Sequence, residues 1–226
     1  MSSKLQLSHF IDLQSTHSPS TRIRFPDSPF DLLGKNLLLW LEELLHELGV
    51  KSSLLNHGEV SPQAAIEGSV YIAKGAIVEP FAYIKGPAYI GPEAKVRHGA
   101  FIRDGAYIGK KAVVGHTTEV KGSVFFDGAK ASHFAYVGDS ILGCKVNLGA
   151  GTKLANLKLK ADEIYYLDPQ TGLRCASGLR KFGSILGDGA QTGCNSVLSP
   201  GSLLLPHTHI YPAVHFHGTL KPRAKV

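Results

Sequence analysis

The chain has 226 residues, a formal net charge of +6, 25 glycines and three cysteines. Lysines and arginines are scattered among aspartates and glutamates, which argues against a nucleic-acid partner, and no apolar run is long enough to cross a bilayer. The cysteines form no CxxC pair and leave one over. We therefore expect reduced thiols, a cytoplasmic location and no membrane attachment.

Residues 1–59 are expected to form an N-terminal arm and a capping helix. Residues 1–26 show no period and predict at most short strands near 5–13 and 21–25. The helix is predicted to start at Asp27-Ser28-Pro29, to carry a leucine stripe to Leu48 and to end at Gly49. We expect it to cover the open end of the following domain, where unpaired strand edges would otherwise associate.

A six-residue period dominates the chain from residue 60 onward. Aliphatic residues fall six apart from Ile66 through Val120 to Phe126, and a small residue, most often alanine, follows four places after most of them. Val124 continues the second row. This period is typical of a stacked parallel β-helix with three hexads per coil, so we predict an all-β solenoid over residues 60–218.

The period is predicted to break twice. Residues 128–141 carry no clean hexad, so the functional site is expected to begin just after Phe126. Residues 157–184 leave the period again and predict a hairpin-like loop that projects from the solenoid, with a turn at 168–172. Residues 219–226 are predicted to be a basic tail.

The first interruption carries a motif that is similar to a known family. Residues 130–139, Lys-Ala-Ser-His-Phe-Ala-Tyr-Val-Gly-Asp, and 146–152, Val-Asn-Leu-Gly-Ala-Gly-Thr, resemble the acetyltransferase domain of the bifunctional N-acetylglucosamine-1-phosphate uridyltransferase and glucosamine-1-phosphate N-acetyltransferase family. Residues 29–33, 178–189 and 192–195 look most like its archaeal-type branch. The family's N-terminal nucleotidyltransferase domain is missing, so uridyl transfer is not expected from this chain, and a separate uridyltransferase is a possible partner.

The resemblance implies a left-handed parallel β-helix that forms a homotrimer, with each site completed by a neighbour's loop, for which residues 157–184 are the candidate. It implies acetyl transfer from acetyl-coenzyme A to an amino sugar phosphate, first of all glucosamine 1-phosphate. The roles it implies are catalysis by His133, Asn147 and Ala150, substrate binding by Arg103, Lys121, Tyr136, Asn147 and Lys181, and coenzyme A binding by Ala150, Asn156, Cys194 and Pro212. Residues 206–213 depart from the family's smaller residues, which bears on the coenzyme A contacts there.

These residue types suit that chemistry. An imidazole is well matched to taking a proton from an amine near neutral pH, so His133 is the general-base candidate. A backbone N–H, here that of Ala150, can stabilise the oxyanion of a tetrahedral intermediate. Arginine and lysine side chains such as Arg103 and Lys121 can surround a phosphate.

Other interpretations remain open. The histidines near the C-terminus alternate as on a strand but have no supporting cysteine or carboxylate set, so no metal is expected; they are His207, His209, His215 and His217. The chain could instead acylate a different, nucleotide-linked amino sugar. It could also be a non-catalytic β-helix assembly subunit.

Overall fold

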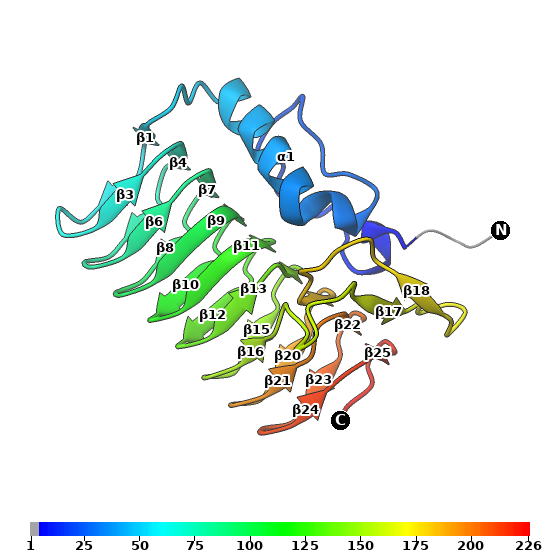
Figure 1. The fold of residues 1–226 in the computed structure, drawn as a ribbon. Coiled ribbons are helices and arrows are strands. Elements are labelled where there is room, and N and C mark those ends of the chain that lie inside the picture. The colour runs from blue at the N-terminus through cyan, green and yellow to red at the C-terminus, as the bar shows by residue number, and fades with distance from the viewer. Residues whose placement is uncertain (1–4) are drawn as a thin grey trace.

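The computed structural model describes residues 5–226 and shows a left-handed parallel β-helix flanked by one α-helix (Figure 1). Strand partners in successive coils, such as Ile72 and Ile90, are separated by three hexads. The predicted fold class is therefore confirmed. Within residues 5–226, no helix has the length and apolar character that a membrane span needs.

Each coil has three flat faces, which we number in chain order. The first face holds β1 (Leu54–Asn56), β4 (Val70–Ile72), β7 (Ala88–Ile90), β14 (Ile141–Leu142), β19 (Ser184–Leu186), β22 (Ser202–Leu204) and β25 (Thr219–Leu220). The second face holds β2 (Glu59–Val60), β5 (Ile77–Val78), β8 (Lys95–Val96), β10 (Val113–His116), β12 (Lys130–His133), β15 (Asn147–Leu148), β20 (Gln191–Thr192) and β23 (His209–Ile210). The third face holds β3 (Ala65–Glu67), β6 (Tyr83–Lys85), β13 (Tyr136–Gly138), β16 (Lys153–Leu154), β21 (Val197–Leu198) and β24 (His215–Phe216).

Two longer strands, β9 (Phe101–Ile108) and β11 (Glu119–Phe125), turn the corner from the third face to the first. They join these two faces into one 15-stranded sheet, whereas the second face forms a separate 8-stranded sheet. One aliphatic residue per face and coil points inward, with alanines beside it, and together they form the core of the solenoid. The aliphatic row and the row of small residues that the sequence shows are the residues of this core.

The period slips by one residue at Gly122. Arg103 pairs with Lys121, three full hexads further along the chain, but Ala106 pairs with Ser123, which falls one residue short of that spacing. Phe125 therefore enters the core, while Val124 and Phe126 point outward toward the helix. The prediction that the hexads run without a slip to Phe126 is wrong, because one residue is missing at this corner and adjacent apolar residues conceal the loss.

Residues 128–141 are a regular part of the solenoid. The next coils keep the shorter spacing, with Lys130 paired to Asn147 and Tyr136 paired to Lys153, each one residue short of three hexads. Ala131 fills the inward position of the second face. The interruption expected here is a change of register, and it begins before Phe126 rather than after it.

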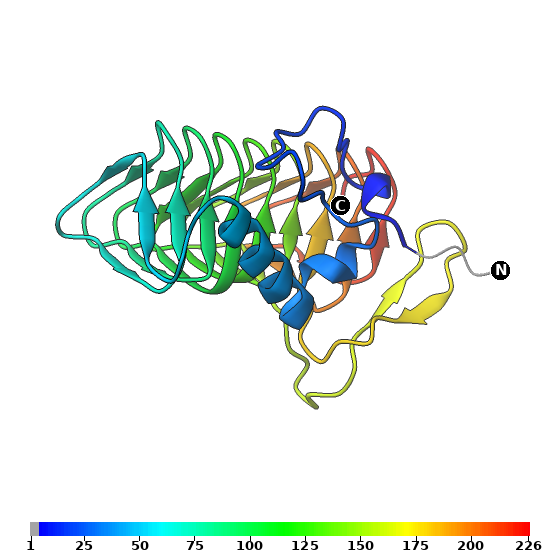
Figure 2. The ribbon, with the colours of Figure 1, turned by 90° about the horizontal axis from the view of Figure 1, so that it is seen from above.

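Helix α1 (Gly34–Glu47) lies along the first face, not over an end of the solenoid (Figure 2). Its buried leucines pack with outward residues of that face, including Tyr89 and Tyr107. The predicted start at Ser28 caps a separate 3-10 turn, η2 (Pro29–Leu32), and Gly49 (φ +85°) follows the helix. The prediction that the helix covers the open end is wrong, because its apolar stripe matches an apolar flank.

The arm contains a 3-10 turn, η1 (Leu7–His9), and its residues 5–26 form no strand, within the prediction of at most short strands. Phe10 and Ile11 are buried, so the arm extends the cover of the first face. Residues 1–4 lie outside the described part of the chain.

Residues 157–184 form an excursion that contains an antiparallel hairpin of β17 (Tyr165–Leu167) and β18 (Arg174–Ala176), as predicted. It also packs back on the N-terminal region, because the Phe30 ring lies 5.4 Å from that of Tyr166 and 5.6 Å from that of Phe182. Both ends of the solenoid extend past the expected bounds of 60 and 218. The strands begin at β1, and residues 219–226 continue the coil through β25 and a bridge from His209 to Lys225 instead of forming a free tail.

Candidate active site

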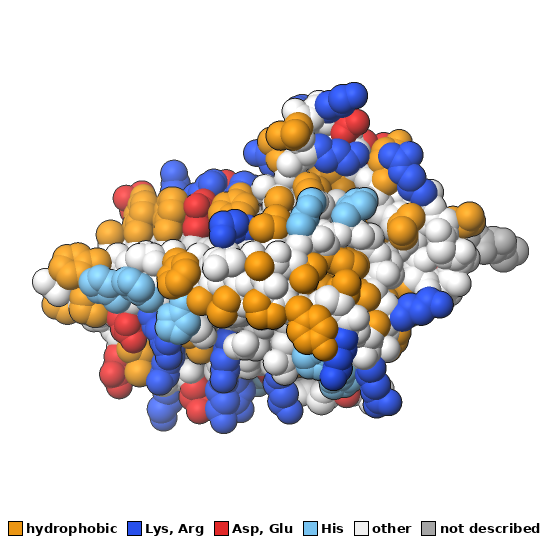
Figure 3. Space-filling model, turned by 90° about the horizontal axis from the view of Figure 1, so that it is seen from below, with side chains coloured by type: hydrophobic (Ala, Val, Ile, Leu, Met, Phe, Trp, Pro, Cys, Tyr) orange, Lys and Arg blue, Asp and Glu red, His pale blue; other side chains and the backbone are white. Residues whose placement is uncertain are grey.

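The residues expected to carry the chemistry lie mainly on the third face and at its two corners. We call the turn from the second to the third face the histidine corner. Figure 3 shows one side of the solenoid, where histidines lie at intervals and lysine and arginine side chains stand along one edge. The turn from the third face to the first holds a cluster of charged residues.

The histidine corner stacks several predicted residues in a single row, one from each coil. The row consists of His98, His116, His133, Ala150, Cys194 and Pro212. The backbone carbonyl of each of the first five accepts a hydrogen bond from a backbone N–H of the next coil; in the same order, the donors are Thr117, Phe134, Gly151, Asn195 and Ala213. The predicted base, the predicted oxyanion donor and two predicted coenzyme A contacts therefore follow one another in successive coils.

His133 ends strand β12, and its side chain is exposed. Its corner is packed so closely that a Cβ on Gly115, one coil earlier, would lie 1.8 Å from the carbonyl oxygen of Ser132. In the next coil Gly151 N donates to His133 O at 3.1 Å, which places Ala150 beside the base. Within residues 5–226, the Ala150 N–H donates to no acceptor, so it is free to bind a ligand.

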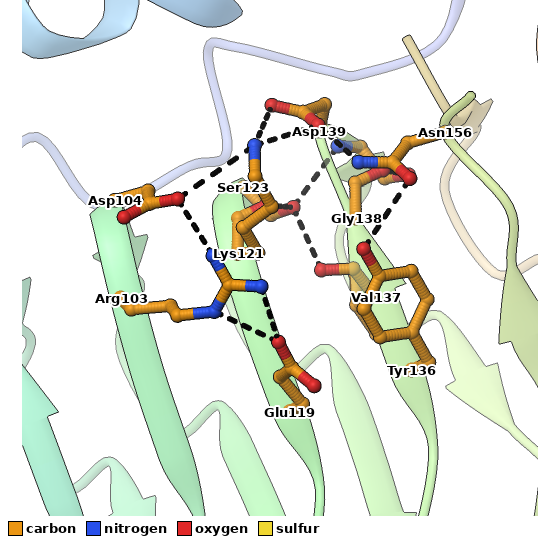
Figure 4. Close-up of polar contacts among 11 residues, drawn as sticks. Arg103, Asp104, Glu119, Lys121, Ser123, Tyr136, Val137, Gly138, Asp139 and Asn156 are labelled. Carbon is orange, nitrogen blue, oxygen red and sulfur yellow. Dashed lines mark hydrogen bonds and ion pairs between the residues drawn. The ribbon is translucent and has the colours of Figure 1, made fainter. Parts of the chain in front are cut away.

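The second group is the charged cluster, defined as Arg103, Asp104, Glu119, Lys121 and Asp139 (Figure 4). Arg103 Nε donates to Glu119 Oε1 at 2.8 Å, and its Nη1 lies 2.7 Å from Asp104 Oδ2. Both pairs are partly exposed, so the guanidinium remains accessible from the third face.

Lys121 and Asp139 form the buried part of the cluster. Lys121 Nζ lies 2.7 Å from Asp139 Oδ1 and 2.9 Å from Oδ2, with side-chain exposures of 11% and 4%. Asp104 Oδ2 lies 4.0 Å from the same ammonium. Lys121 is thus already neutralised within the chain, which the sequence did not indicate.

Tyr136 and Asn156 adjoin this pair. The Tyr136 hydroxyl donates to Asn156 Oδ1 at 3.3 Å, and Asn156 Nδ2 donates to Asp139 Oδ2. Partial burial, and then the negative charges of Glu119 and Asp139, raise the pKa of Tyr136, so its phenol keeps its proton near neutral pH. Asn156, predicted to contact coenzyme A, is buried with both ends of its amide engaged in the chain.

Two predicted residues lie apart from both groups. Asn147 is exposed on the second face, between Lys130 and Gln191 of the adjacent coils. Lys181 is exposed on the excursion and lines an open cleft with Lys35 of α1. Their roles remain predictions, as do those of the other site residues.

Sequence reasoning missed the three carboxylates of the charged cluster. Asp139 lies about one coil after Lys121, Glu119 lies about one coil after Arg103, and Asp104 is adjacent to Arg103. An acid about one coil from a cation is a signal that can be read once the coil length is known. No group of three histidine, cysteine or carboxylate side chains suited to a metal occurs within residues 5–226.

The family model described as GMPPB C-terminal domain matches residues 84–219, which is more than half of the chain. The chain belongs to this family. The bifunctional protein GlmU of Methanococcus maripaludis (strain C7) is 46% identical over 173 residues, which cover 76% of this chain and 39% of that protein. A bifunctional sugar-1-phosphate nucleotidylyltransferase/acetyltransferase of Sulfurisphaera tokodaii is 41% identical over 96 residues, which cover 42% of this chain and 23% of that protein.

The resemblance drawn from residues 130–152 is thereby confirmed. The chain spans less than half the length of these curated relatives. Among solved structures, a putative acetyltransferase of Bacillus cereus is 15% identical with a TM-score of 0.40, over 75% of each chain. A mutant of the N-acyltransferase AntD of Bacillus cereus, in complex with dTDP and coenzyme A, is 15% identical with a TM-score of 0.33, over 80% of this chain and 81% of that one.

Proposed function

We propose that this protein transfers the acetyl group of acetyl-coenzyme A to the amine of an amino sugar phosphate, with glucosamine 1-phosphate as the first candidate. The observation that carries the proposal is the juxtaposition of exposed His133 with the unpaired N–H of Ala150 in the next coil. A base and an oxyanion donor on one corner are the two groups that direct acyl transfer to an amine requires. The GlmU relatives support the same chemistry.

In the proposed reaction, His133 removes a proton from the acceptor amine as its nitrogen attacks the thioester carbon. The new C–N bond gives a tetrahedral oxyanion, which the Ala150 N–H stabilises. The C–S bond then breaks, and the coenzyme A thiolate leaves and takes the proton from the imidazolium. No covalent enzyme intermediate is needed, so the cysteines take no part in the chemistry.

The two substrates would bind at the two groups of residues described above, the histidine corner and the charged cluster. Coenzyme A would run along the histidine corner toward Cys194 and Pro212, and the acceptor would lie on the third face near Tyr136. Arg103 offers an accessible guanidinium to the phosphate, and Lys181 of a neighbouring copy would supply a further cation in a homotrimer. A cytoplasmic location and a separate uridyltransferase acting on the product complete the proposal.

One observation favours a non-catalytic assembly subunit as a second candidate. The charged cluster contains two cations and three carboxylates, so in the single chain both cations are already paired. A phosphate cradle more often has cations in excess.

A thiol-release assay separates the two candidates. The purified protein is mixed with acetyl-coenzyme A and glucosamine 1-phosphate, and free coenzyme A is measured against time. We expect release that depends on the acceptor. Nucleotide-linked amino sugars and unphosphorylated glucosamine are tested in parallel to define the acceptor class. No release with any amino sugar would favour the assembly subunit.

A further inference from the structure

Asp139 connects three successive coils beneath the third face. Its carboxylate holds Lys121 of the preceding coil and accepts from Asn156 of the following coil. Its backbone N–H donates to Lys121 O at 2.7 Å, and its carbonyl accepts from Gly183 N at 2.9 Å, where the excursion returns. Asp139 adopts φ +42°, a conformation that is uncommon outside glycine. The backbone of Asp139 is thus fixed on both sides, and its carboxylate is held by Lys121 and Asn156.

The carboxylate of Asp139 determines which group donates and which accepts in the hydrogen bonds from Tyr136 through Asn156. An ionised carboxylate only accepts, so the side of the Asn156 amide that faces it is the NH2 group. The amide oxygen then faces the Tyr136 hydroxyl, which must donate its proton to that oxygen. The hydroxyl has only one proton, so its oxygen can only accept from a molecule bound on the third face.

We infer that Asp139 is a positioning residue that, through Asn156, turns the Tyr136 oxygen into a hydrogen-bond acceptor for the amine of the bound acceptor. The inference rests on the proposed acetyl transfer, and it names a role for a residue outside the predicted site. An acceptor at this place favours a ligand that carries an N–H or ammonium group over one with a carbonyl or carboxylate in that position.

The backbone around Asp139 leaves space for this arrangement. A Cβ on Gly122 would lie 2.7 Å from Asp139 Oδ1, and one on Gly138 would lie 2.7 Å from Asn156 Cγ and 2.8 Å from Tyr136 Cε1. Real Cβ atoms do not approach other atoms so closely, so any side chain at these positions would displace the carboxylate, the amide or the ring. The network is therefore accommodated by the local backbone.

The Asp139→Asn variant tests the direction of the hydrogen bonds that link Tyr136, Asn156 and Asp139. The new amide oxygen would face the Lys121 ammonium, so its NH2 group would face Asn156 and force that amide to turn over. Tyr136 would then accept from Asn156 and could only donate to the ligand. We expect KM for the acceptor amine to rise roughly 10- to 100-fold, as for a lost hydrogen bond to a charged group, and KM for acetyl-coenzyme A to stay within about twofold.

A double-mutant cycle with Tyr136→Phe separates positioning from general damage. Tyr136→Phe alone should raise the acceptor KM by a similar factor. In the Asp139→Asn background, Tyr136→Phe should raise this KM by less than about a further twofold, because the Tyr136 oxygen there no longer accepts a hydrogen bond from the amine. Fully multiplicative effects, or an unchanged acceptor KM in Asp139→Asn, would overturn the inference.

Nuclear magnetic resonance provides a readout on the wild-type protein that needs no activity; the assignment uses one variant whose spectrum otherwise matches that of the wild type. In the wild-type protein, one side-chain amide proton of Asn156, assigned from its loss in Asn156→Ser, should be shifted downfield and slow to exchange because it donates to a carboxylate. A rapidly exchanging amide with ordinary shifts would contradict the network itself. A positive result in a protein that releases no coenzyme A would refute only the proposed function.

Discussion

The first and third faces are built by the same coils but present opposite surfaces. Outward residues of the first face, such as Tyr89, Tyr107 and Ile141, are buried under α1 and the arm. Those of the third face, such as Glu119, Tyr136 and Lys153, stay at least partly exposed and polar. Because the inward residues are alike on both faces, the outward rows alone decide which face is covered and which is free to bind ligands.

The largest expected effect is a loss of turnover, caused by a substitution at the corner that leads into the third face. His133→Ala should lower turnover by about two to four orders of magnitude, the contribution of a general base, without changing thermal unfolding, because the side chain is exposed. His116→Ala is the matched control, since His116 pairs with His133 one coil earlier. Comparable turnover in the two variants would remove the proposed role of His133.

A change on the covered face should act on stability instead. Leu41 of α1 is fully buried, so Leu41→Ala should lower the free energy of unfolding by about 3 kcal/mol, measured by urea denaturation. Leu39→Ala on the same helix, where the side chain is 64% exposed, should cost less than about 0.5 kcal/mol. Turnover of the folded Leu41 variant should match the wild type; a selective loss of turnover would show that the faces are coupled.

The guanidinium of Arg103 should matter only for a phosphorylated acceptor. Arg103→Gln is expected to raise KM for glucosamine 1-phosphate about tenfold and to leave KM for glucosamine unchanged, because a charge-assisted contact to phosphate is lost. Lys85→Gln, one coil earlier on the same face, is the control, since Lys85 is exposed. Equal effects on both acceptors would place the phosphate elsewhere.

The smallest effect concerns the cysteines. Cys194 is exposed on the histidine corner, so Cys194→Ala should change KM for acetyl-coenzyme A only about two- to fivefold, as expected for one weak contact. Iodoacetamide at pH 8 should label Cys194, and coenzyme A should slow that labelling.

Cys144 serves as the internal control. Burial raises the pKa of its thiol to about 11, so only about one molecule in a thousand carries the reactive thiolate at pH 8. Peptide mass spectrometry after alkylation measures both sites. Rapid labelling of Cys144 would show that the arm, whose Thr16 contacts its sulfur, does not cover it in solution.

The coils could be predicted from the sequence because one residue per hexad has to fit a narrow interior. The slip at Gly122 could not, since Phe125 and Phe126 are equally suited to a core and only strand pairing distinguishes them. The position of α1 could not either, because an apolar stripe matches a flank as well as an end.

The candidate site was predicted in part. His133 and Ala150 were identified from a motif, and their adjacency follows from the coil length. The ion pair of Lys121 with Asp139 was missed, although the two residues lie about one coil apart; after the slip the strand partner of Lys121 is Gly138. Asp139 comes one residue later, where the backbone has left the strand at φ +42°, and its carboxylate reaches back to the ammonium. That geometry depends on the corner, which the hexads do not describe.

The strands of the solenoid pair with one another across the excursion, although its last residues also hydrogen-bond to the coils, with Gly183 N donating to Asp139 O. Ile141 of β14 pairs directly with Ile185 of β19, and Leu154 of β16 pairs with Leu198 of β21. The excursion is thus inserted at a single corner and interrupts no strand pairing of the coils, but its Ile164, Tyr166 and Phe182 are buried in the cluster that covers the first face. Another loop could therefore replace it without changing the register of the strands, provided that the new loop buries the same cluster, and the neighbouring surface would then recognise a different ligand.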